Sequence, residues 1–115
     1  SIISKIINSI NKRETLNILN QGSAIRDYIH IDDVVATYAK LITLKNIRYI
    51  NIASGLGTSV KNIIDYLKIN KIDINVTSVS KKEIKISTSS VDKLIKIIDI
   101  KKFQYVEKFI LDKFI

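Results

Sequence analysis

The spacing of hydrophobic residues along the chain alternates between a helical and a strand-like repeat. Near the start, isoleucines at positions 2, 3, 6, 7 and 10 fall on one side of a helix. Spacings of three and four residues recur in four later segments, which predicts further amphipathic helices. The predicted helices cover residues 2–11, 33–42, 60–67, 91–98 and 105–114.

Strand-like patterns lie between these helices. Alternating positions and short apolar runs, one of them typical of a buried strand, predict four strands. The predicted strands cover residues 15–19, 24–31, 48–53 and 74–79. Helices and strands are mixed without a repeat, a linker or a break in composition. We therefore expect residues 1–115 to form a single α/β unit.

The second predicted strand carries several polar side chains. Its alternation places Arg26, Tyr28 and His30 on one face and Asp27 on the other. An arginine on a strand either clamps a phosphate or carboxylate of a ligand or pairs with an acidic side chain of the protein. Asp27 is a poor partner because it points away, and both uses of Arg26 stay open. Tyr28 either contacts a ligand or fills the sheet surface.

The polar residues that follow have structural explanations. His30 has no cysteine or acidic partner at the spacing of metal ligands, so we expect a structural histidine and no metal site. Asp32 suits the N-cap of the next helix. Asp33 suits its first turn, where the positive end of the helix dipole favours a carboxylate.

Two glycines separate a predicted strand from a helix, as in loops that bind dinucleotides. Val60 stands where such a loop has its third glycine, so we expect Gly55 and Gly57 to form a tight turn with Ser59 as helix N-cap. A weak anion site at that helix start stays open. No nucleophile lies beside a base, and no Y-x-x-x-K pair occurs, so we expect no catalytic residues in this chain.

Composition narrows the function classes. The net charge is +8, but the lysines are scattered without interleaved aromatic residues, so we expect solvated helix faces rather than a nucleic-acid surface. No apolar run approaches the length of about 20 residues that crosses a membrane. The absence of cysteine fits a reducing compartment, and we expect a cytoplasmic protein. The absence of methionine suggests a piece of a longer protein.

The stretch Gly22-Ser-Ala-Ile-Arg-Asp-Tyr-Ile-His-Ile-Asp-Asp33 resembles a motif of the NAD-dependent epimerase/dehydratase family, G-x-x-x-RD-[YF]-[IV]-[HY]-V-x-D. These extended short-chain dehydrogenases act on nucleotide sugars. Two weaker similarities follow in the family's order. They are the segment from Tyr49 to Gly55, which is like Y-N-[IL]-G-S-G, and the segment SSVDKLIKII, which begins at Ser89.

The resemblance implies a particular part of such an enzyme. It implies the C-terminal substrate-binding lobe, together with one strand and one helix that would complete a Rossmann sheet. The glycine-rich loop for NAD or NADP and the catalytic Y-x-x-x-K would lie in a missing N-terminal Rossmann portion. This chain alone would be inactive and bind no cofactor. The parent enzyme would be a homodimer that uses a UDP- or dTDP-linked sugar and contacts neither nucleic acid nor membrane.

The resemblance also implies four substrate-binding residues. Arg26 would contact the diphosphate of the nucleotide sugar and Tyr28 would line the nucleotide pocket. Lys81 or Lys82 would replace a second arginine of the family as a looser point charge. Leu19-Asn20 stands where the family often has an aromatic residue and a glycine, so base stacking is lost there. The alternative is a decayed, non-catalytic homologue that binds anions or serves in assembly.

Overall fold

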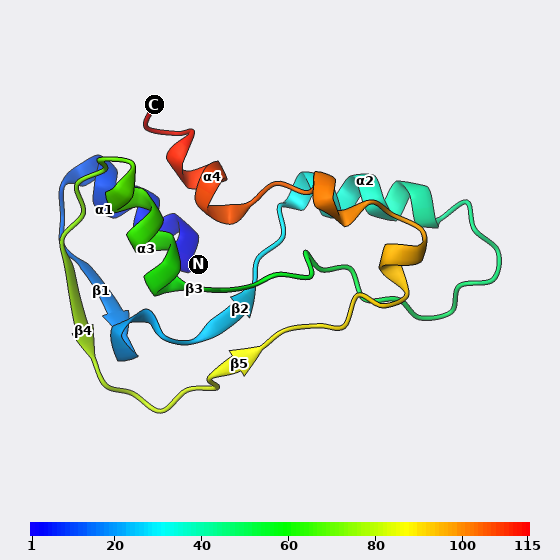
Figure 1. Ribbon diagram of the computed structural model, residues 1–115, viewed down its shortest axis with the longest axis horizontal. Coiled ribbons are helices and arrows are strands. Elements are labelled where there is room, and N and C mark those ends of the chain that lie inside the picture. The colour runs from blue at the N-terminus through cyan, green and yellow to red at the C-terminus, as the bar shows by residue number, and fades with distance from the viewer.

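The computed structural model describes all 115 residues and has the predicted α/β composition (Figure 1). Four α-helices, three short 3₁₀ turns and five strands make up the chain. The helices are α1 (Ile2–Lys12), α2 (Ile31–Leu41), α3 (Val60–Ile69) and α4 (Val106–Leu111). The 3₁₀ turns are η1 (Asn20–Gly22), η2 (Leu94–Lys96) and η3 (Ile100–Lys102). The strands are β1 (Leu16–Leu19), β2 (Ile25–Asp27), β3 (Gly57–Ser59), β4 (Val76–Val79) and β5 (Ile86–Ser87).

A parallel pair of strands supports the main core. β1 and β4 lie side by side with Leu16 opposite Val76 and Leu19 opposite Val79. The apolar faces of α1, α3 and α4 pack around this pair, as their helical spacing requires. The fully buried residues at the centre of the core are Ile6, Ile63, Leu67 and Ile110.

A second, mixed sheet carries the sequence motif around Arg26. Its strand order is β3-β2-β5, with β2 antiparallel to β3 and parallel to β5. Arg26 lies opposite Thr58 on one neighbour and Ser87 on the other. The motif is therefore the central strand of the sheet, and its side chains are held between two neighbours.

Gly22 connects the two sheets. Its φ of +75° lies in the left-handed region, which glycine adopts without strain. A Cβ at this position would lie 2.7 Å from the backbone N of Lys61. Only glycine therefore lets η1 pass so close to the start of α3.

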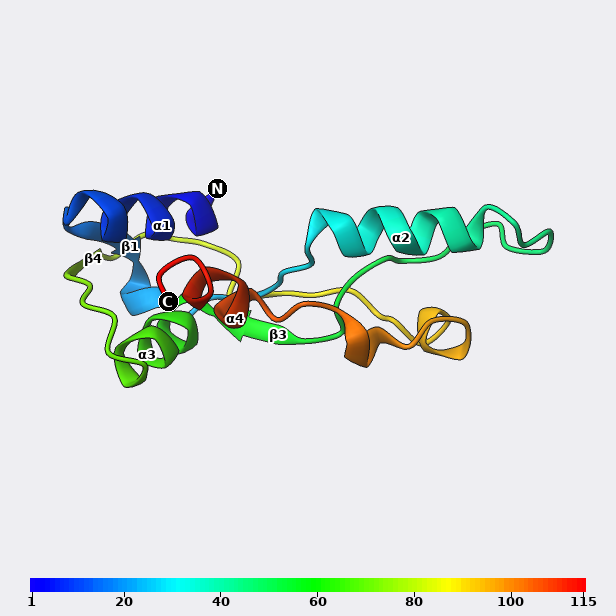
Figure 2. The same cartoon turned by 90° about the horizontal axis from the view of Figure 1, so that it is seen from above.

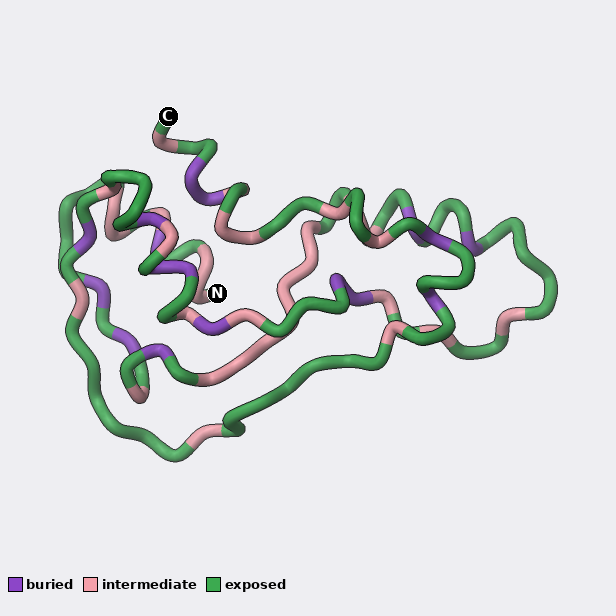
Figure 3. The backbone as a smooth tube through the Cα atoms, viewed as in Figure 1, coloured by how far each residue is buried: buried purple, intermediate pink, exposed green.

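The outer half of the molecule is loosely packed. A small cluster of Leu41, Leu94 and Ile98 holds α2 against the segment around η2. Figure 2 shows α2 standing apart from α1 and α3, and Figure 3 shows the buried residues concentrated around the main core. The radius of gyration is 16.1 Å, whereas a compact chain of this length has about 13 Å. None of the helices combines the length and apolar character that crossing a membrane requires.

Three predicted elements are absent or shortened. Residues 48–53 form no strand, and their backbone makes no hydrogen bond to another backbone group, because no neighbouring strand is present to pair with them. The predicted strand 24–31 is reduced to Ile25–Asp27, the length over which β3 provides a partner. The predicted helix 91–98 is reduced to the 3₁₀ turn η2, around which two helical bonds remain, from the N–H of Ile95 to the O of Val91 and from that of Ile98 to the O of Leu94.

Candidate functional site

A polar cleft lies where the two parallel strands end. The carboxyl ends of β1 and β4 meet at the same edge of their sheet, so the loops that follow them emerge side by side. Such edges are the usual ligand sites of parallel sheets. The cleft has a volume of about 350 Å³. Its lining residues are Asn20, Ser23, Ala24, Lys81, Lys82, Glu83 and Lys85.

Positive charge dominates this cleft. Lys81, Lys82 and Lys85 are exposed, and Glu83 is the one acidic residue among the lining residues. None of these four side chains forms an ion pair, since the ion pairs of the chain are His30–Asp32, Lys61–Asp65 and Lys108–Asp112. Unpaired ammonium groups attract an anion to the cleft.

Arg26 lies beside the cleft. It is not itself a lining residue, but its strand borders the cleft, because the N–H of Ile25 donates to the backbone O of Lys85 at 2.7 Å and Arg26 lies opposite Ser87. Its Nη1 donates to the backbone O of Ile25 at 2.9 Å, and no carboxylate lies within ion-pair distance. Of the two uses that the sequence left open, the pairing with an internal acid does not occur. The remaining guanidinium donors are free to bind a phosphate or carboxylate.

Tyr28 lies close to Arg26 and Glu83. Burial of its phenol raises its pKa, the positive charge of Arg26 lowers it, and the negative charge of Glu83 raises it further. The half-buried ring also borders a larger cavity of about 620 Å³, formed by residues 54–58 and 95–107. That cavity is mainly hydrophobic and contains neither Arg26 nor the lysines of the cleft. Tyr28 therefore lines the apolar cavity and lies near Glu83, a lining residue of the basic cleft.

Asp27 points away from Arg26, as predicted, and fixes a turn of the chain. Its Oδ1 accepts the backbone N–H of Ser54 at 2.8 Å and its Oδ2 that of Gly55 at 2.9 Å. The N–H of Leu56 donates to Ser54 Oγ at 3.1 Å. Three successive N–H groups are thus occupied within the protein, so this turn cannot hold the phosphates of a dinucleotide.

The start of α3 is also closed. Ser59 is its N-cap, as predicted, and its Oγ accepts the backbone N–H of Asn62 at 3.0 Å. With this donor occupied as well, the residues around Gly55 and Gly57 serve as a capped turn. The described residues also contain no group of three or more histidine and acidic side chains that could hold a metal ion.

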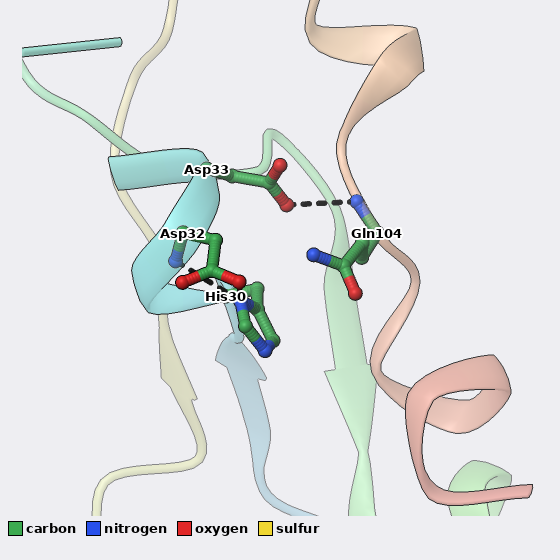
Figure 4. A network of polar contacts seen from close by, with 4 residues as sticks. All are labelled: His30, Asp32, Asp33 and Gln104. Carbon is green, nitrogen blue, oxygen red and sulfur yellow. Dashed lines mark hydrogen bonds and ion pairs between the residues drawn. The ribbon is translucent and has the colours of Figure 1, made fainter. Parts of the chain in front are cut away.

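The prediction that Asp32 caps α2 is wrong. The N-cap is His30, whose Nδ1 accepts the backbone N–H of Asp32 at 3.0 Å (Figure 4). The helix begins at Ile31, two residues earlier than expected, so Asp32 lies in its first turn together with Asp33. The His30 ring contacts Phe109 edge to face, with 4.9 Å between the ring centroids. This confirms a structural histidine.

Asp33 links α2 to the segment before α4. Its Oδ2 accepts the backbone N–H of Gln104 at 2.9 Å (Figure 4). Because β2 ends at Asp27, strand alternation does not extend to His30. His30, Asp32 and Asp33 instead cap α2 and link it to Gln104, and they do not join Arg26 and Tyr28. The polar residues of the motif are therefore divided between Arg26 and Tyr28 on one side and a capping group on the other.

Asn20 is a lining residue of the cleft that sequence reasoning assigned no role. It begins η1 at a φ of +50°, in the left-handed region that asparagine tolerates better than most residues. Its amide bonds to the backbone of Lys81, 61 positions away in the chain. A non-local contact of this kind leaves only a weak signal in the sequence, namely a turn-forming residue directly after a strand.

Comparison with known families identifies the motif. The model of the NAD dependent epimerase/dehydratase family matches residues 1–53, which include α1, β1, β2 and α2. No curated protein matches the sequence significantly.

Solved structures match almost the whole chain. A UDP-N-acetylglucosamine 4-epimerase from Methanobrevibacter ruminantium, solved with UDP-N-acetylmuramic acid, has a TM-score of 0.80 and 22% identity, and the match covers 97% of this chain and 37% of that protein. A UDP-glucuronic acid 4-epimerase from Bacillus cereus with bound NAD has a TM-score of 0.77 and 20% identity, over 96% and 36% of the two chains. An NAD-dependent NDP-hexosamine 5,6-dehydratase of tunicamycin biosynthesis has the same TM-score and identity, over 96% and 37%.

The chain spans a little over a third of the length of these proteins. At these identities the structural matches establish the fold. Over residues 1–53 the chain thus matches the NAD-dependent epimerase/dehydratase family, as the motif around Arg26 predicted, and over nearly its whole length it has the fold of part of an extended short-chain dehydrogenase epimerase.

Proposed function

We propose that this chain is the C-terminal, substrate-binding portion of an NAD-dependent nucleotide-sugar epimerase or dehydratase and is inactive alone. The observation that supports this most directly is the arginine without an ion pair, Arg26, beside a lysine-lined cleft at the carboxyl ends of two parallel strands. The family match of the same segment agrees with that arrangement.

Each of the four predicted binding residues receives a role under this proposal. Arg26 clamps the diphosphate of a UDP- or dTDP-linked sugar, because its planar guanidinium can donate two parallel hydrogen bonds. Lys81 and Lys82 add positive charge around the nucleotide as flexible point charges. Tyr28 lies near Arg26 and Glu83 and lines the apolar cavity, and under this proposal its ring contacts the nucleotide there.

The cofactor belongs to the rest of the enzyme. NAD or NADP, when bound there, takes a hydride from a sugar carbon and so supports epimerisation or dehydration. We place its site outside this chain, because in the turn that carries Gly55 the N–H groups of residues 54–56 are occupied by Asp27 and Ser54. The contribution of this chain is to bind and orient the substrate.

The exposed side of α2 supports the proposal of a missing portion. Ile31, Val35, Tyr38 and Ile42 form one stripe along this helix, and each is 59–70% exposed. The accessible surface of the chain is 8302 Å², compared with about 6,400 Å² for a compact protein of its mass. An N-terminal Rossmann sheet that packs on this stripe would bury it.

The adjoining segment supports the same partner. Residues 48–53 begin seven positions after the end of α2 and have no backbone–backbone hydrogen bonds, which is the condition of a strand without a neighbour. Pairing of this segment with the edge of the same sheet would satisfy those groups. The full-length enzyme is further proposed to be a cytoplasmic homodimer, a location that the absence of cysteine fits.

Titration of the full-length enzyme with UDP- and dTDP-sugars tests the proposal. Loss of a charge-assisted hydrogen bond predicts that Arg26→Ala weakens binding by about 10- to 150-fold. Lys5→Ala is the control, because it removes a positive charge from an exposed residue of α1 that does not line the cleft. Equal affinities of the wild type and Arg26→Ala would remove the role of Arg26. Binding that collapses with salt and shows no preference for nucleotide sugars would instead favour the non-catalytic, anion-binding homologue.

A further inference from the structure

Asn20 and Lys81 form a reciprocal pair of hydrogen bonds. Asn20 Nδ2 donates to the backbone O of Lys81 at 2.5 Å, and Asn20 Oδ1 accepts the backbone N–H of Lys81 at 2.9 Å. The side-chain amide thus pairs with Lys81 as another backbone residue would. Asn20 directly follows Leu19, which with Val79 forms the last backbone pair of the parallel strands.

This pair supports the loop at Lys81 and Lys82, whereas the last loop residue, Lys85, accepts the backbone N–H of Ile25 at 2.7 Å. Between the end of β4 at Val79 and Lys85, the loop residues make no hydrogen bond other than the two to Asn20. Lys81 and Lys82 are exposed and form no ion pair, so their own side chains do not anchor the loop. The position of these charges in the cleft therefore depends on Asn20.

The conformation of η1 suits Asn20 to this task. Asn20, Gln21 and Gly22 all have positive φ values, of 50°, 59° and 75°. The N–H of Gln21 donates to Ser78 Oγ at 2.7 Å, which holds the turn against β4 separately from the Lys81 loop. Both polar atoms of the Asn20 amide bond to the backbone of Lys81, so the orientation of this side chain is set by its contact with the loop.

We infer that Asn20 is a positioning residue, which holds the loop of Lys81 and Lys82 so that both ammonium groups face the diphosphate of the bound nucleotide. This inference rests on the proposed function. It explains how two flexible lysines, which stand in place of a rigid arginine, are restricted to one region of the cleft.

The test is a set of UDP titrations of the full-length enzyme. Asn20→Gly removes the side chain and keeps a residue that adopts positive φ without strain. We expect it to weaken UDP binding about 3- to 10-fold. Asn70→Gly is the matched control, because Asn70 also donates from its side-chain amide to a backbone O, that of Tyr66 at 2.9 Å, at the far end of α3. It should leave UDP affinity unchanged.

A double-mutant cycle separates positioning from general stability. In a Lys81→Ala, Lys82→Ala background, Asn20→Gly should cost less than about 2-fold in UDP affinity, since the groups it positions are gone. A merely structural role predicts the same loss of affinity in both backgrounds. The fall in melting temperature caused by Asn20→Gly should be similar in both.

Each outcome of these titrations supports or overturns the positioning role of Asn20. Suppose that the wild type binds UDP. If the Asn20→Gly variant then binds UDP equally well, or if the substitution weakens UDP binding equally in both backgrounds, the positioning role is wrong while the proposed function stands. If the wild type binds neither UDP nor, in a parallel titration, dTDP, the proposed function fails and the inference with it. Hydrogen exchange of the wild type adds a test without a variant, because the amide of Lys81 should be protected and those of Lys82 and Glu83 should not.

Discussion

Asp27 and Gly55 are joined by a hydrogen bond between the central strand of the mixed sheet and the turn before β3. Asp27 Oδ2 accepts the N–H of Gly55 at 2.9 Å, while Oδ1 accepts that of Ser54. The two residues are 28 positions apart, so one carboxylate closes a long loop that contains α2. Asp27 therefore has a structural task that its neighbour Arg26 does not share.

Removal of this carboxylate should destabilise the fold. Asp27→Ala leaves two N–H donors without their acceptor, and we expect a loss of about 2–3 kcal/mol in the free energy of unfolding. Asp27→Asn should lose less, because its one amide oxygen still accepts a hydrogen bond. Urea unfolding measures both. Asp73→Ala is the control, an exposed carboxylate without a hydrogen bond, and should stay within about 0.5 kcal/mol of the wild type. Equal stabilities of the two alanine variants would contradict this role.

A side chain at position 22 should be still less tolerated. Gly22→Ala combines a left-handed φ of +75° with a Cβ only 2.7 Å from the backbone N of Lys61. Strain and overpacking together predict a loss of about 2–4 kcal/mol in the free energy of unfolding. Ser23→Ala, at an ordinary φ of −77°, is the matched control and should change little. A Gly22→Ala variant as stable as Ser23→Ala would show that η1 can move away from α3.

The sequence identified features that depend on local chemistry. The helical spacing of isoleucines located α1 because burial of one helix face needs no knowledge of its partner. Alternation placed Arg26 and Asp27 on opposite faces correctly, since it follows from the geometry of any extended strand. Ser59 was recognised as an N-cap because its bond to Asn62 lies within three residues.

Features that depend on distant partners could not be predicted. The apolar segment 48–53 has the composition of a strand, but a strand forms only where a neighbour supplies its hydrogen bonds. The bonds from Asp27 to Gly55 and from Asn20 to Lys81 join residues far apart in the chain. The Asp32 prediction failed for a different reason. Capping preferences favour aspartate over histidine, and the contact of His30 with Phe109 decided the choice.

The titration of Tyr28 should make stability depend on pH in the alkaline range. Burial raises its pKa above the ordinary value of 10.0, the charge of Arg26 lowers it and that of Glu83 raises it. The folded state thus holds the phenol proton more tightly than the unfolded state. This stabilising contribution is complete below about pH 10 and is lost as the pH rises from there through the raised folded-state pKa.

Two variants check this assignment. Tyr28→Phe should remove the alkaline loss of stability that is due to this residue, whereas Tyr49→Phe, at an 80% exposed tyrosine, should retain it. Arg26→Ala should shift the pKa of Tyr28 still higher, because the variant removes a nearby positive charge. Phenolate absorbance measures the titration directly. An unchanged Tyr28 pKa in Arg26→Ala would mean that the two side chains do not interact as described.

The apolar stripe of α2 should behave differently in this chain and in a full-length enzyme. Val35→Glu places a charge in the stripe, and the matched variant Ala36→Glu places one on the polar side of the same helix, near Asp32 and Lys40. For the 115-residue chain we expect concentration-dependent self-association in sedimentation velocity, reduced by Val35→Glu but not by Ala36→Glu.

In the full-length enzyme the same two variants should differ in stability. Burial of the stripe under the Rossmann sheet predicts that Val35→Glu lowers the free energy of unfolding by about 2–4 kcal/mol, because a carboxylate would lose its hydration there. Ala36→Glu should stay within about 0.5 kcal/mol of the wild type, since its side of the helix remains in water. Thermal or urea unfolding measures the difference. Equal stabilities of the two variants would mean that no part of the enzyme covers Val35, and the proposed partner of α2 would have to be abandoned.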